Sequence, residues 1–219
     1  MTVENRAAIV TGGAHGLGRA IALRLADDGA DVMVADVLGA DAEVVAESVR
    51  AKGRRAASFE VDVSDSGAVG AMVMAAVEAF GHVDLLVNNA GVSGEAGLLE
   101  MEEAHWDRIM GVNLKGNFLC SQAVAREMVA RGEGGRIINI TSTAGANARP
   151  RASAYGASDP LRRASNDRRS AFKCHFAPPK SLTAHRQLAS RVAAVHEDNL
   201  SVDVRRVRRR QERHRGGNV

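Results

Sequence analysis

A short apolar run that ends in two glycines restricts the possible folds of this chain more than any other feature. Residues 7–11 read Ala-Ala-Ile-Val-Thr, and Gly12 and Gly13 follow directly. The run is too short for a helix and is typical of a buried strand. Apolar residues then recur at roughly helical spacing over Leu17–Asp28, and Gly29 stands where a helix C-cap is expected. A strand, a glycine turn and a helix in this order predict the start of a β-α-β unit.

The same alternation continues as far as residue 141. Further strands are predicted at Asp31–Asp36, Ala56–Val63, Val83–Asn88 and Arg136–Thr141, and further helices at Asp41–Lys52, about Ser66 to Phe80, Met101–Met110 and Asn113–Ala130. Ser64 is expected to cap the helix that begins near residue 66. Because β-α-β crossovers are right-handed, this order predicts an α/β fold, a Rossmann-like doubly wound parallel sheet with helices on both faces.

The composition fits one α/β domain of ordinary globular character. The chain has 219 residues, of which 45% are hydrophobic and 25% are charged. Two cysteines cannot form a disulfide framework, and Cys120, in an apolar helical stretch, is expected to be a buried thiol. No signal peptide, membrane-length apolar run or zinc-type ligand spacing is visible. The sequence therefore predicts a cytoplasmic location, no membrane partner and no metal.

The net charge of +3 conceals two parts of opposite charge. Residues 1–158 carry 14 Lys and Arg against 20 Asp and Glu, whereas residues 159–219 carry 15 against 6. Glycine divides at the same point, because 20 of the 22 glycines precede residue 159. We therefore expect a Rossmann-like domain over residues 1–158 and a divergent basic C-terminal segment over residues 159–219.

The first strand-to-helix turn has the composition of a phosphate-binding loop. It reads Thr-Gly-Gly-Ala-His-Gly-Leu-Gly over residues 11–18. Glycines allow a tight turn in which the backbone approaches a pyrophosphate, and free N–H groups at the helix N-terminus attract the anion. A glycine turn without a ligand is the alternative, but the strand before it and the helix after it favour a dinucleotide. The candidate cofactor-binding residues here are Thr11, Gly12, His15, Gly16, Leu17 and Gly18.

Two aspartates at the ends of the next two strands are candidate contacts for the adenosine half of a dinucleotide. Asp36 ends the second strand, where a carboxylate accepts hydrogen bonds from both ribose hydroxyls and repels a 2′-phosphate. That arrangement favours NAD over NADP, and an ordinary turn aspartate is the alternative. Asp62 and Val63 end the third strand, where they are expected to approach the adenine.

The order of these motifs resembles the short-chain dehydrogenase/reductase family over about residues 5–158. The family's N-N-A-G motif is present as residues 88–91, after the fourth predicted strand. The resemblance implies that this motif supports the sheet and the adenosine side of the cofactor. It adds three candidate cofactor-binding residues, Asn89, Ala90 and Gly91.

The same resemblance implies three catalytic residues. Ser142 matches the family's catalytic serine, and Tyr155 follows it by 13 residues, which is the family's spacing. Asn113 matches the helix asparagine that maintains a water link in the family's proton relay. The implied activity is an NAD(P)-dependent oxidoreductase that interconverts a secondary alcohol and a ketone by hydride transfer. Relatives of this kind include 3-oxoacyl reductases and polyol or hydroxysteroid dehydrogenases, and the family's members are homo-oligomers.

This chemistry requires a cation beside the tyrosine. A tyrosine hydroxyl has a reference pKa of about 10, so its surroundings must lower that pKa by about three units, roughly 4 kcal/mol, before it acts as a base near neutral pH. The family uses a lysine four residues later, on the same helix face. This chain has Asp159 at that position, and an anion acts on a tyrosine pKa in the opposite direction. Pro160 also disfavours a continuing helix.

Residues 160–219 do not continue the family pattern, and two explanations stay open. One is an altered reading frame from about codon 159, and the other is natural divergence in which Arg162 or Arg163 replaces the lysine. Seven arginines in residues 205–215 would bind phosphate without specificity, but no aromatic residues accompany them, so no specific nucleic-acid partner is expected. The competing hypothesis to an active dehydrogenase is a catalytically silent nucleotide-binding variant.

Overall fold

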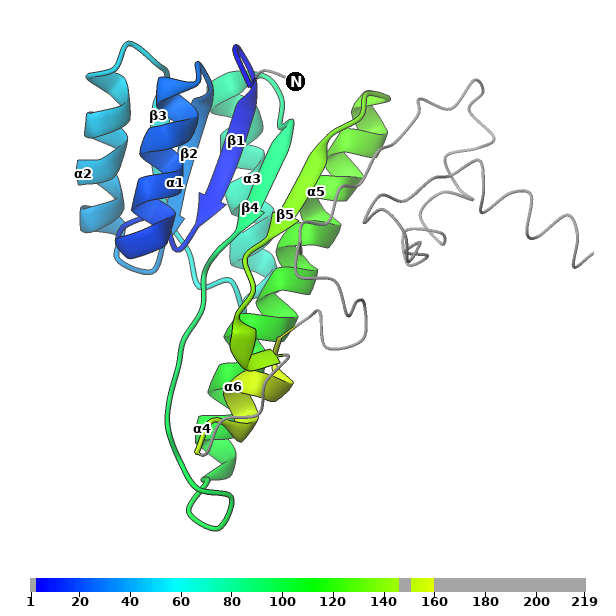
Figure 1. Ribbon diagram of the computed structural model, residues 1–219. Coiled ribbons are helices and arrows are strands. Elements are labelled where there is room, and N and C mark those ends of the chain that lie inside the picture. Colours follow the sequence, from blue (N-terminus) through cyan, green and yellow to red (C-terminus); the bar gives the residue numbers. More distant parts are fainter. Residues whose placement is uncertain (1–2, 146–150, 160–219) are drawn as a thin grey trace, which may run out of the picture.

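A parallel five-stranded sheet forms the centre of the molecule, as the α/β expectation requires (Figure 1). The computed structural model describes residues 3–145 and 151–159, so the expectations placed on residues 160–219 lie outside the described residues. The strand order is β3-β2-β1-β4-β5, and every neighbouring pair is parallel. The strands are β1 (Ala7–Thr11), β2 (Asp31–Asp36), β3 (Ala56–Glu60), β4 (Leu85–Asn88) and β5 (Arg136–Asn139).

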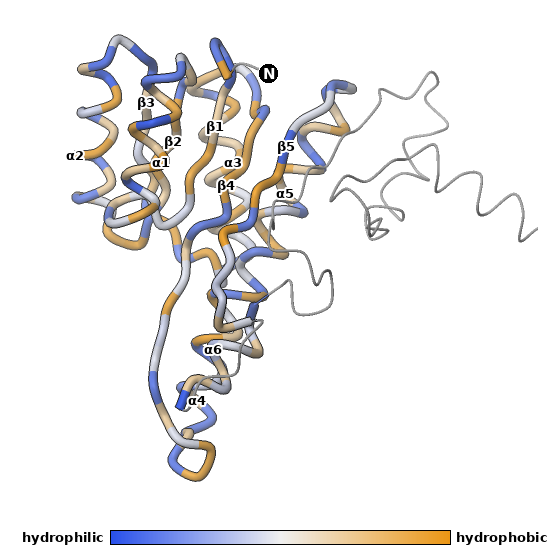
Figure 2. The backbone as a smooth tube through the Cα atoms, in the orientation of Figure 1, coloured by the Kyte–Doolittle hydropathy of each residue, from blue (hydrophilic) through white to orange (hydrophobic). Residues whose placement is uncertain are grey.

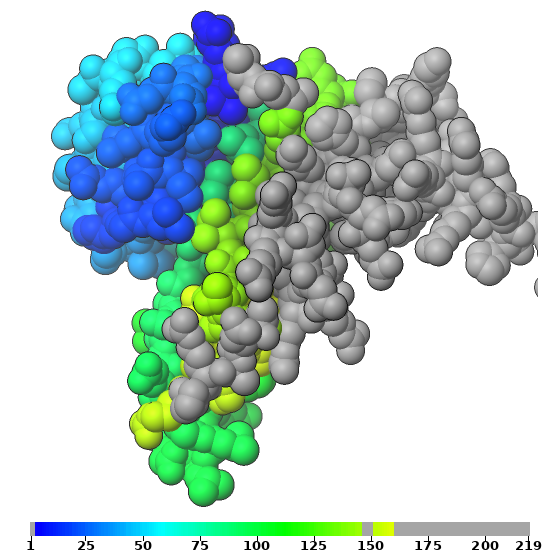
Figure 3. All heavy atoms as spheres, viewed as in Figure 1, coloured from blue at the N-terminus to red at the C-terminus, as the bar shows by residue number. Residues whose placement is uncertain are grey.

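Helical segments connect these strands and lie on both faces of the sheet. They are α1 (Gly16–Asp27), α2 (Gly39–Arg50), α3 (Ser66–Phe80), α4 (Glu103–Ile109), a π-helical segment (Met110–Gly116), α5 (Asn117–Arg131), a 3₁₀ turn (Thr143–Gly145) and α6 (Ser153–Ala157). Figure 1 shows α1 and α2 against one part of the sheet, and α4 and α6 together at the lower end of the view. In the space-filling view the yellow atoms of α6 lie against green atoms of the same end (Figure 3). None of the helices in the described ranges has the length and apolarity needed to cross a membrane.

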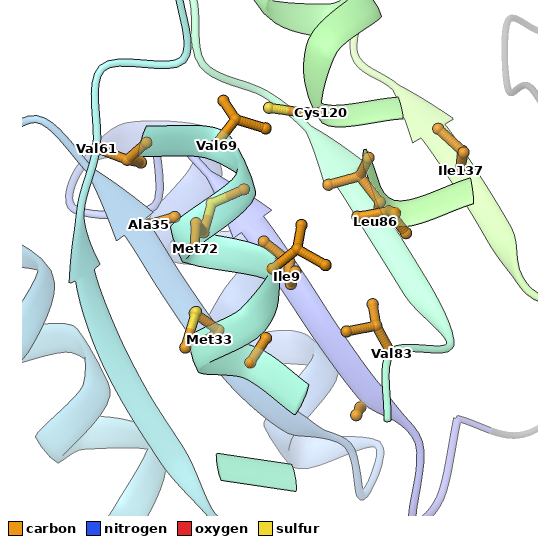
Figure 4. Packing of buried hydrophobic residues seen from close by; sticks show 14 of the residues in the cluster. Ile9, Met33, Ala35, Val61, Val69, Met72, Val83, Leu86, Cys120 and Ile137 are labelled. Carbon is orange, nitrogen blue, oxygen red and sulfur yellow. The ribbon is translucent and has the colours of Figure 1, made fainter. Parts of the chain in front are cut away.

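The central strands are apolar on both faces because both faces are covered. Alternate residues such as Ile9, Met33 and Leu86 pack with α3 and α5, whereas their neighbours Val10 and Val34 pack with α1 and α2. Figure 4 shows the first of these clusters, and Figure 2 shows strand segments in the orange of hydrophobic residues beside helices of mixed colour. A continuous apolar strand is what a doubly covered parallel sheet requires.

Cys120 belongs to the first of these two clusters and is 1% exposed (Figure 4). Burial raises the pKa of its thiol to about 12, which leaves it protonated at neutral pH. The expectation of a buried thiol is therefore confirmed.

Two local predictions at the end of β3 are wrong. The strand ends at Glu60 instead of residue 63, because its last partner on β2 is Asp36. The cap of α3 is Asp65, whose carboxylate accepts the N–H groups of two residues in the first turn. Ser64 instead donates its hydroxyl to Asp62, so it shapes the turn and does not cap the helix.

The two helices expected over residues 101–110 and 113–130 form one continuous helical stretch. The α-helix α4 passes into the π-helical segment at Met110, and that segment passes into α5 at Asn117. An inserted π turn often marks a functional site, because it displaces side chains and carbonyl groups from the regular ladder. Asn113 lies in the middle of this segment.

The strand order places a crevice at the carboxyl ends of β1 and β4. The chain runs from β1 outwards to β2 and β3, and then crosses back to β4 on the other side of β1. The connections that leave β1 and β4 therefore diverge, and ligands of open α/β sheets bind in the opening between them. The candidate residues after both strands, Gly12 and Asn89, face this opening.

A buried carboxylate fastens the opposite end of these two strands. Asp84 is 6% exposed, and its oxygens accept the N–H of Ala7 at 3.0 Å and guanidinium groups of Arg6 and Arg131 at 3.2 and 3.0 Å. His82 Nε2 lies 2.9 Å from the same carboxylate. Burial opposes ionisation, but the Ala7 N–H and the neighbouring cations outweigh it and hold the pKa of Asp84 below its usual range.

We predict that Asp84→Asn lowers the free energy of unfolding by about 2 to 3 kcal/mol at pH 7, because it leaves the partly buried guanidinium group of Arg131 and its neighbours without their anion. Since the folded-state pKa of Asp84 is depressed, its contribution is complete above the unfolded-state pKa of about 4. The contribution disappears as the pH falls through the folded-state pKa. Urea unfolding of both chains between pH 7 and pH 3 measures this difference.

The matched control for this prediction is Asp28→Asn, which removes an exposed carboxylate that pairs with Arg24 in one helix. This control is expected to unfold at the urea concentration of the parent chain. Equal stability of the parent and Asp84→Asn at pH 7 would contradict the structural role assigned to Asp84.

Candidate active site

The hydroxyl group of Thr11 joins the loops that follow β1 and β4. Its Oγ1 accepts the backbone N–H of Asn89 at 3.0 Å and that of Ala90 at 3.1 Å, and donates to the carbonyl of Val87 at 3.4 Å. Asn89 reciprocates, because its Nδ2 donates to the carbonyls of Thr11 and Gly12. The glycine turn and the Asn-Asn-Ala-Gly motif are thus one hydrogen-bonded unit.

Two glycines of this turn are required by the space available. A Cβ built on Gly18 would lie 2.0 Å from the carbonyl oxygen of Gly12, which no side chain tolerates. Gly12 itself has a φ of +62° and its Cβ would lie 2.8 Å from Ala90 Cα. The first turn of α1 therefore packs directly on the loop before it, and its N-terminus opens towards the crevice.

A cavity of about 700 Å³ lies beside the glycine turn, at the carboxyl ends of β1, β2 and β3. It is lined by nine of the residues predicted to bind a cofactor, namely Gly12, His15, Gly16, Asp36, Asp62, Val63, Asn89, Ala90 and Gly91. Leu17 lines a second cavity instead, and Thr11 and Gly18 shape the turn without lining either one. This volume is in the range of small-molecule sites.

Asp36 is held at the mouth of this cavity by two backbone groups. Its Oδ2 accepts the N–H of Ala14 at 3.0 Å, and its Oδ1 accepts the N–H of Leu38 at 3.1 Å. Each carboxylate oxygen keeps further acceptor capacity, so the group can also receive hydrogen bonds from a ligand. His15, on the same side, has its Nε2 2.9 Å from the carboxylate of Asp41.

Asp62 is oriented by the turn that follows β3. Its Oδ1 accepts the hydroxyl of Ser64 at 2.7 Å and the N–H of the same residue at 2.9 Å. These two hydrogen bonds, helped by the positive charge of Lys115, outweigh a small desolvation and lower the pKa of the exposed Asp62 carboxyl. Asp62 is therefore an ionised acceptor at the edge of the larger cavity.

The second cavity, of about 370 Å³, brings together the three predicted catalytic residues. Ser142 reaches it from the segment after β5, Tyr155 from α6 and Asn113 from the π-helical segment. Residues 89–92 line both cavities, so the two spaces meet at the loop after β4. Such a pair of adjoining spaces can hold a long ligand with two ends.

Asn113 uses its amide group to tie three segments together. Its Oδ1 accepts the N–H of Val92 at 2.8 Å, and its Nδ2 donates to the Val92 carbonyl at 2.9 Å. The same Nδ2 donates to Ser158 Oγ at 3.1 Å, and that hydroxyl donates to the carbonyl of Tyr155 at 2.9 Å. Asn113 therefore fixes the loop after β4 against the helix that carries Tyr155.

Asp159 also lines the smaller cavity, where its carboxylate has a defined contact. Asp159 Oδ2 accepts the backbone N–H of Ser142 at 3.0 Å, and the Ser142 hydroxyl accepts the N–H of Ala144 at 3.2 Å. A carboxylate thus supports the serine loop from a position four residues after Tyr155. The sequence indicated that an anion stands there, but nothing in it indicated this contact.

Sequence reasoning missed several residues that line the cavities. In the larger cavity these are Val37, Ser64, Asp107, Arg108, Gly111 and Val112, and in the smaller one they include Ser93, Asn117, Thr141 and Ser158. Most of them flank a motif by one to four positions, so proximity to the motifs was the only available signal. In the described part of the chain, no group of three or more His, Cys, Asp or Glu is placed to hold a metal ion.

Comparison with known proteins gives a consistent result. The family whose sequence model is described as short chain dehydrogenase matches residues 6–159. The chain is 42% identical over 144 residues to the (2S)-[(R)-hydroxy(phenyl)methyl]succinyl-CoA dehydrogenase subunit BbsD of Thauera aromatica, which covers 66% of this chain and 58% of that protein. It is 42% identical over 147 residues to the 3-oxoacyl-[acyl-carrier-protein] reductase FabG of Staphylococcus epidermidis, with coverage of 67% and 60%.

A solved structure agrees with these relatives. A short-chain type dehydrogenase/reductase from Mycobacterium marinum superposes with a TM-score of 0.69 and is 33% identical, covering 72% of this chain and 65% of that one. The chain thus spans less than two thirds of the length of these relatives. The matched portion contains the whole of both cavities described above.

We predict that Thr11→Val lowers the free energy of unfolding by about 2 to 4 kcal/mol, because two partly buried N–H groups lose their acceptor at about 1 to 3 kcal/mol each. Thr11→Ser keeps the hydroxyl and is expected to lose less than about 1.5 kcal/mol, the cost of one methyl group. Urea unfolding of the three chains provides the comparison. A loss in Thr11→Val no larger than that in Thr11→Ser would contradict the role assigned to the hydroxyl.

Proposed function

The chain belongs to the short-chain dehydrogenase family, and from this membership we propose that it binds NAD and interconverts a secondary alcohol and a ketone by hydride transfer. One observation carries the proposal, namely that a cavity at the glycine turn adjoins a cavity that contains Ser142 and Tyr155. The two halves of a dinucleotide suit these two cavities. The protein recognises the adenosine half, and the nicotinamide half reacts with the substrate.

The names of the relatives support the same reaction class. The proteins from Thauera aromatica and Staphylococcus epidermidis are named as a dehydrogenase and a reductase, and a 2-dehydro-3-deoxy-D-gluconate 5-dehydrogenase of Dickeya dadantii is 40% identical over 140 residues. The substrates in these names differ, which favours a common hydride transfer and not a common substrate. We assign this chain a small alcohol or ketone as substrate.

Each candidate catalytic residue has a distinct role in this proposal. When bound, the nicotinamide supplies the hydride acceptor or donor. Tyr155 takes the proton of the alcohol oxygen as the hydride leaves carbon, and returns it in the reverse direction. Ser142 donates a hydrogen bond to the substrate oxygen and holds it next to the tyrosine. Asn113 holds the loop after β4 and the helix α6 in place through its hydrogen bonds to Val92 and Ser158.

The charges around the larger cavity favour NAD over NADP. Three carboxylates line it, those of Asp36, Asp62 and Asp107, against the guanidinium of Arg108 and the imidazole of His15. Asp36 is the carboxylate at the end of β2, where two backbone N–H groups fix its orientation. A 2′-phosphate placed there would meet an anion, whereas two ribose hydroxyls would meet an acceptor.

We predict that the chain binds NAD at least about tenfold more tightly than NADP, a difference of about 1.4 kcal/mol. Asp36→Asn is expected to weaken NAD binding and to strengthen NADP binding, because it removes the anion and keeps the size of the side chain. Isothermal titration calorimetry with each dinucleotide measures both affinities. Asp28→Asn is the matched control, since Asp28 pairs with Arg24 and does not line the cavity. A preference for NADP in the parent chain would refute the proposal.

A catalytically silent nucleotide-binding protein is the second candidate, and Asp159 is the observation that favours it. Its carboxylate lines the cavity that contains Tyr155 and binds the backbone of Ser142. An anion in this place stabilises the neutral form of a tyrosine hydroxyl and so opposes its action as a base. In this alternative the cofactor cavity still binds a dinucleotide, and only turnover is absent.

We predict that Asp159→Lys raises the turnover of a 3-oxobutyryl thioester with NADH by at least about tenfold, because a cation replaces an anion beside Tyr155. The chain contains one tyrosine, so its tyrosinate absorbance reports this residue alone. In Asp159→Lys the midpoint of this absorbance titration is expected at lower pH than in the parent.

Asp159→Asn is the matched control, because it removes the charge and keeps an oxygen that can accept the Ser142 N–H. Its turnover is expected between that of the parent and that of Asp159→Lys. Binding of NADH without turnover in all three chains would support the silent alternative. Rapid turnover of the parent chain would show that the missing cation does not limit the reaction.

A further inference from the structure

Asn117 is a polar residue in the smaller cavity that no sequence motif distinguishes. It begins α5, directly after the π-helical segment, and lines the cavity with Ser142 and Tyr155. Its Nδ2 donates to the backbone carbonyl of Asn113 at 2.6 Å. Its Oδ1 is buried and has no hydrogen-bond partner among the described residues.

The unpaired oxygen is informative about why an amide stands at this position. A buried acceptor without a donor destabilises the folded state, so an asparagine here is not the choice that stability alone would favour. The contact that this side chain does make is to the carbonyl of Asn113, inside the irregular π turn. The role of the Asn117 amide therefore depends on the residues that Asn113 binds, namely Val92 and Ser158.

A short chain of hydrogen bonds leads from Asn113 to Tyr155. The Asn113 amide bonds both backbone groups of Val92 and the hydroxyl of Ser158. Ser158 is 1% exposed and donates to the Tyr155 carbonyl at 2.9 Å. A displacement of Asn113 is transmitted along these bonds to the helix that carries Tyr155, because the intervening groups are buried and cannot exchange partners with water.

We propose that Asn117 is a positioning residue for Tyr155, acting through Asn113 and Ser158. Its Nδ2 binds the carbonyl of Asn113 and so fixes the orientation of the π turn. That orientation determines where the side-chain amide of Asn113 lies. This inference rests on the proposed role of Tyr155 as the acid/base residue. It assigns Asn117 no contact with the substrate or cofactor.

The test uses two variants of the full chain and one control. Asn117→Asp keeps the shape of the side chain but replaces the donor with an oxygen, and Asn117→Ala removes the side chain. Gln122→Ala, in the same helix and also partly buried, is the matched control. Three quantities are measured in each chain, namely hydrogen exchange of the Val92 amide, the tyrosinate absorbance titration and the urea unfolding midpoint.

Both Asn117 variants are expected to accelerate exchange of the Val92 amide by about tenfold or more, because its acceptor is Asn113 Oδ1. Asn117→Ala, which adds no charge to the cavity, is also expected to move the midpoint of the tyrosinate titration away from that of the parent. The unfolding midpoint of Asn117→Ala is expected to stay near that of Gln122→Ala, because the lost hydrogen bond is offset by the removal of a buried unpaired oxygen.

Two results would overturn the proposal. One is a Val92 exchange rate and a tyrosinate titration that both equal those of the parent. The other is a lower unfolding midpoint with faster exchange at all amides, which would make Asn117 a structural residue only. Neither the Val92 exchange rate nor the tyrosinate titration requires turnover. If the proposed dehydrogenase activity fails, these two shifts are still expected, so the two failures can be told apart. If the parent turns over, the Asn117 variants are expected to lower kcat with little change in KM for NADH.

Discussion

The hydroxyl of Thr11 is the contact on which the site depends most. With one donor and two acceptor positions it binds three backbone groups of the β4 end, and Asn89 returns two hydrogen bonds to the β1 end. Parallel neighbours have no hairpin to fix their ends, so side chains must do it. Because residues 89–92 line both cavities, this contact sets the position of the larger and the smaller cavity together.

Most of the fold follows from the sequence, because each central strand is apolar on both faces and each is bounded by glycine or a polar turn. The glycine turn and Asp36 also followed from residue type and position, and Ser142 and Tyr155 from the resemblance to the family. The structure brings these residues to adjoining cavities. Local hydrogen bonding escaped prediction. Ser64 and Asp65 are both good caps, and the choice between them depends on the competing contact between Ser64 and Asp62.

The π-helical segment was unpredictable for a related reason. Its residues have no pattern that separates them from an α-helix, and the expected break between two helices was placed there instead. Tertiary contacts stabilise the segment, because Asn113 forms hydrogen bonds with Val92 and Ser158, which are distant in sequence. Contacts of this kind are visible only when the segments that follow β4 and β5 are placed beside each other. Asn117 escaped notice because it acts on this segment and belongs to no motif.

Asp159 shows how one residue can preserve a structure while changing its chemistry. Its carboxylate accepts the Ser142 N–H, a contact that an ammonium group cannot make because it has no acceptor. In the proposed reaction, the same negative charge would oppose ionisation of the Tyr155 hydroxyl, which a cation would favour. A change of charge at residue 159 leaves the larger cavity unaltered, since its carboxylates and glycine turn lie at the ends of β1, β2 and β3. In the proposed function, nucleotide binding and proton transfer therefore depend on different residues of adjoining cavities, and the first can persist without the second.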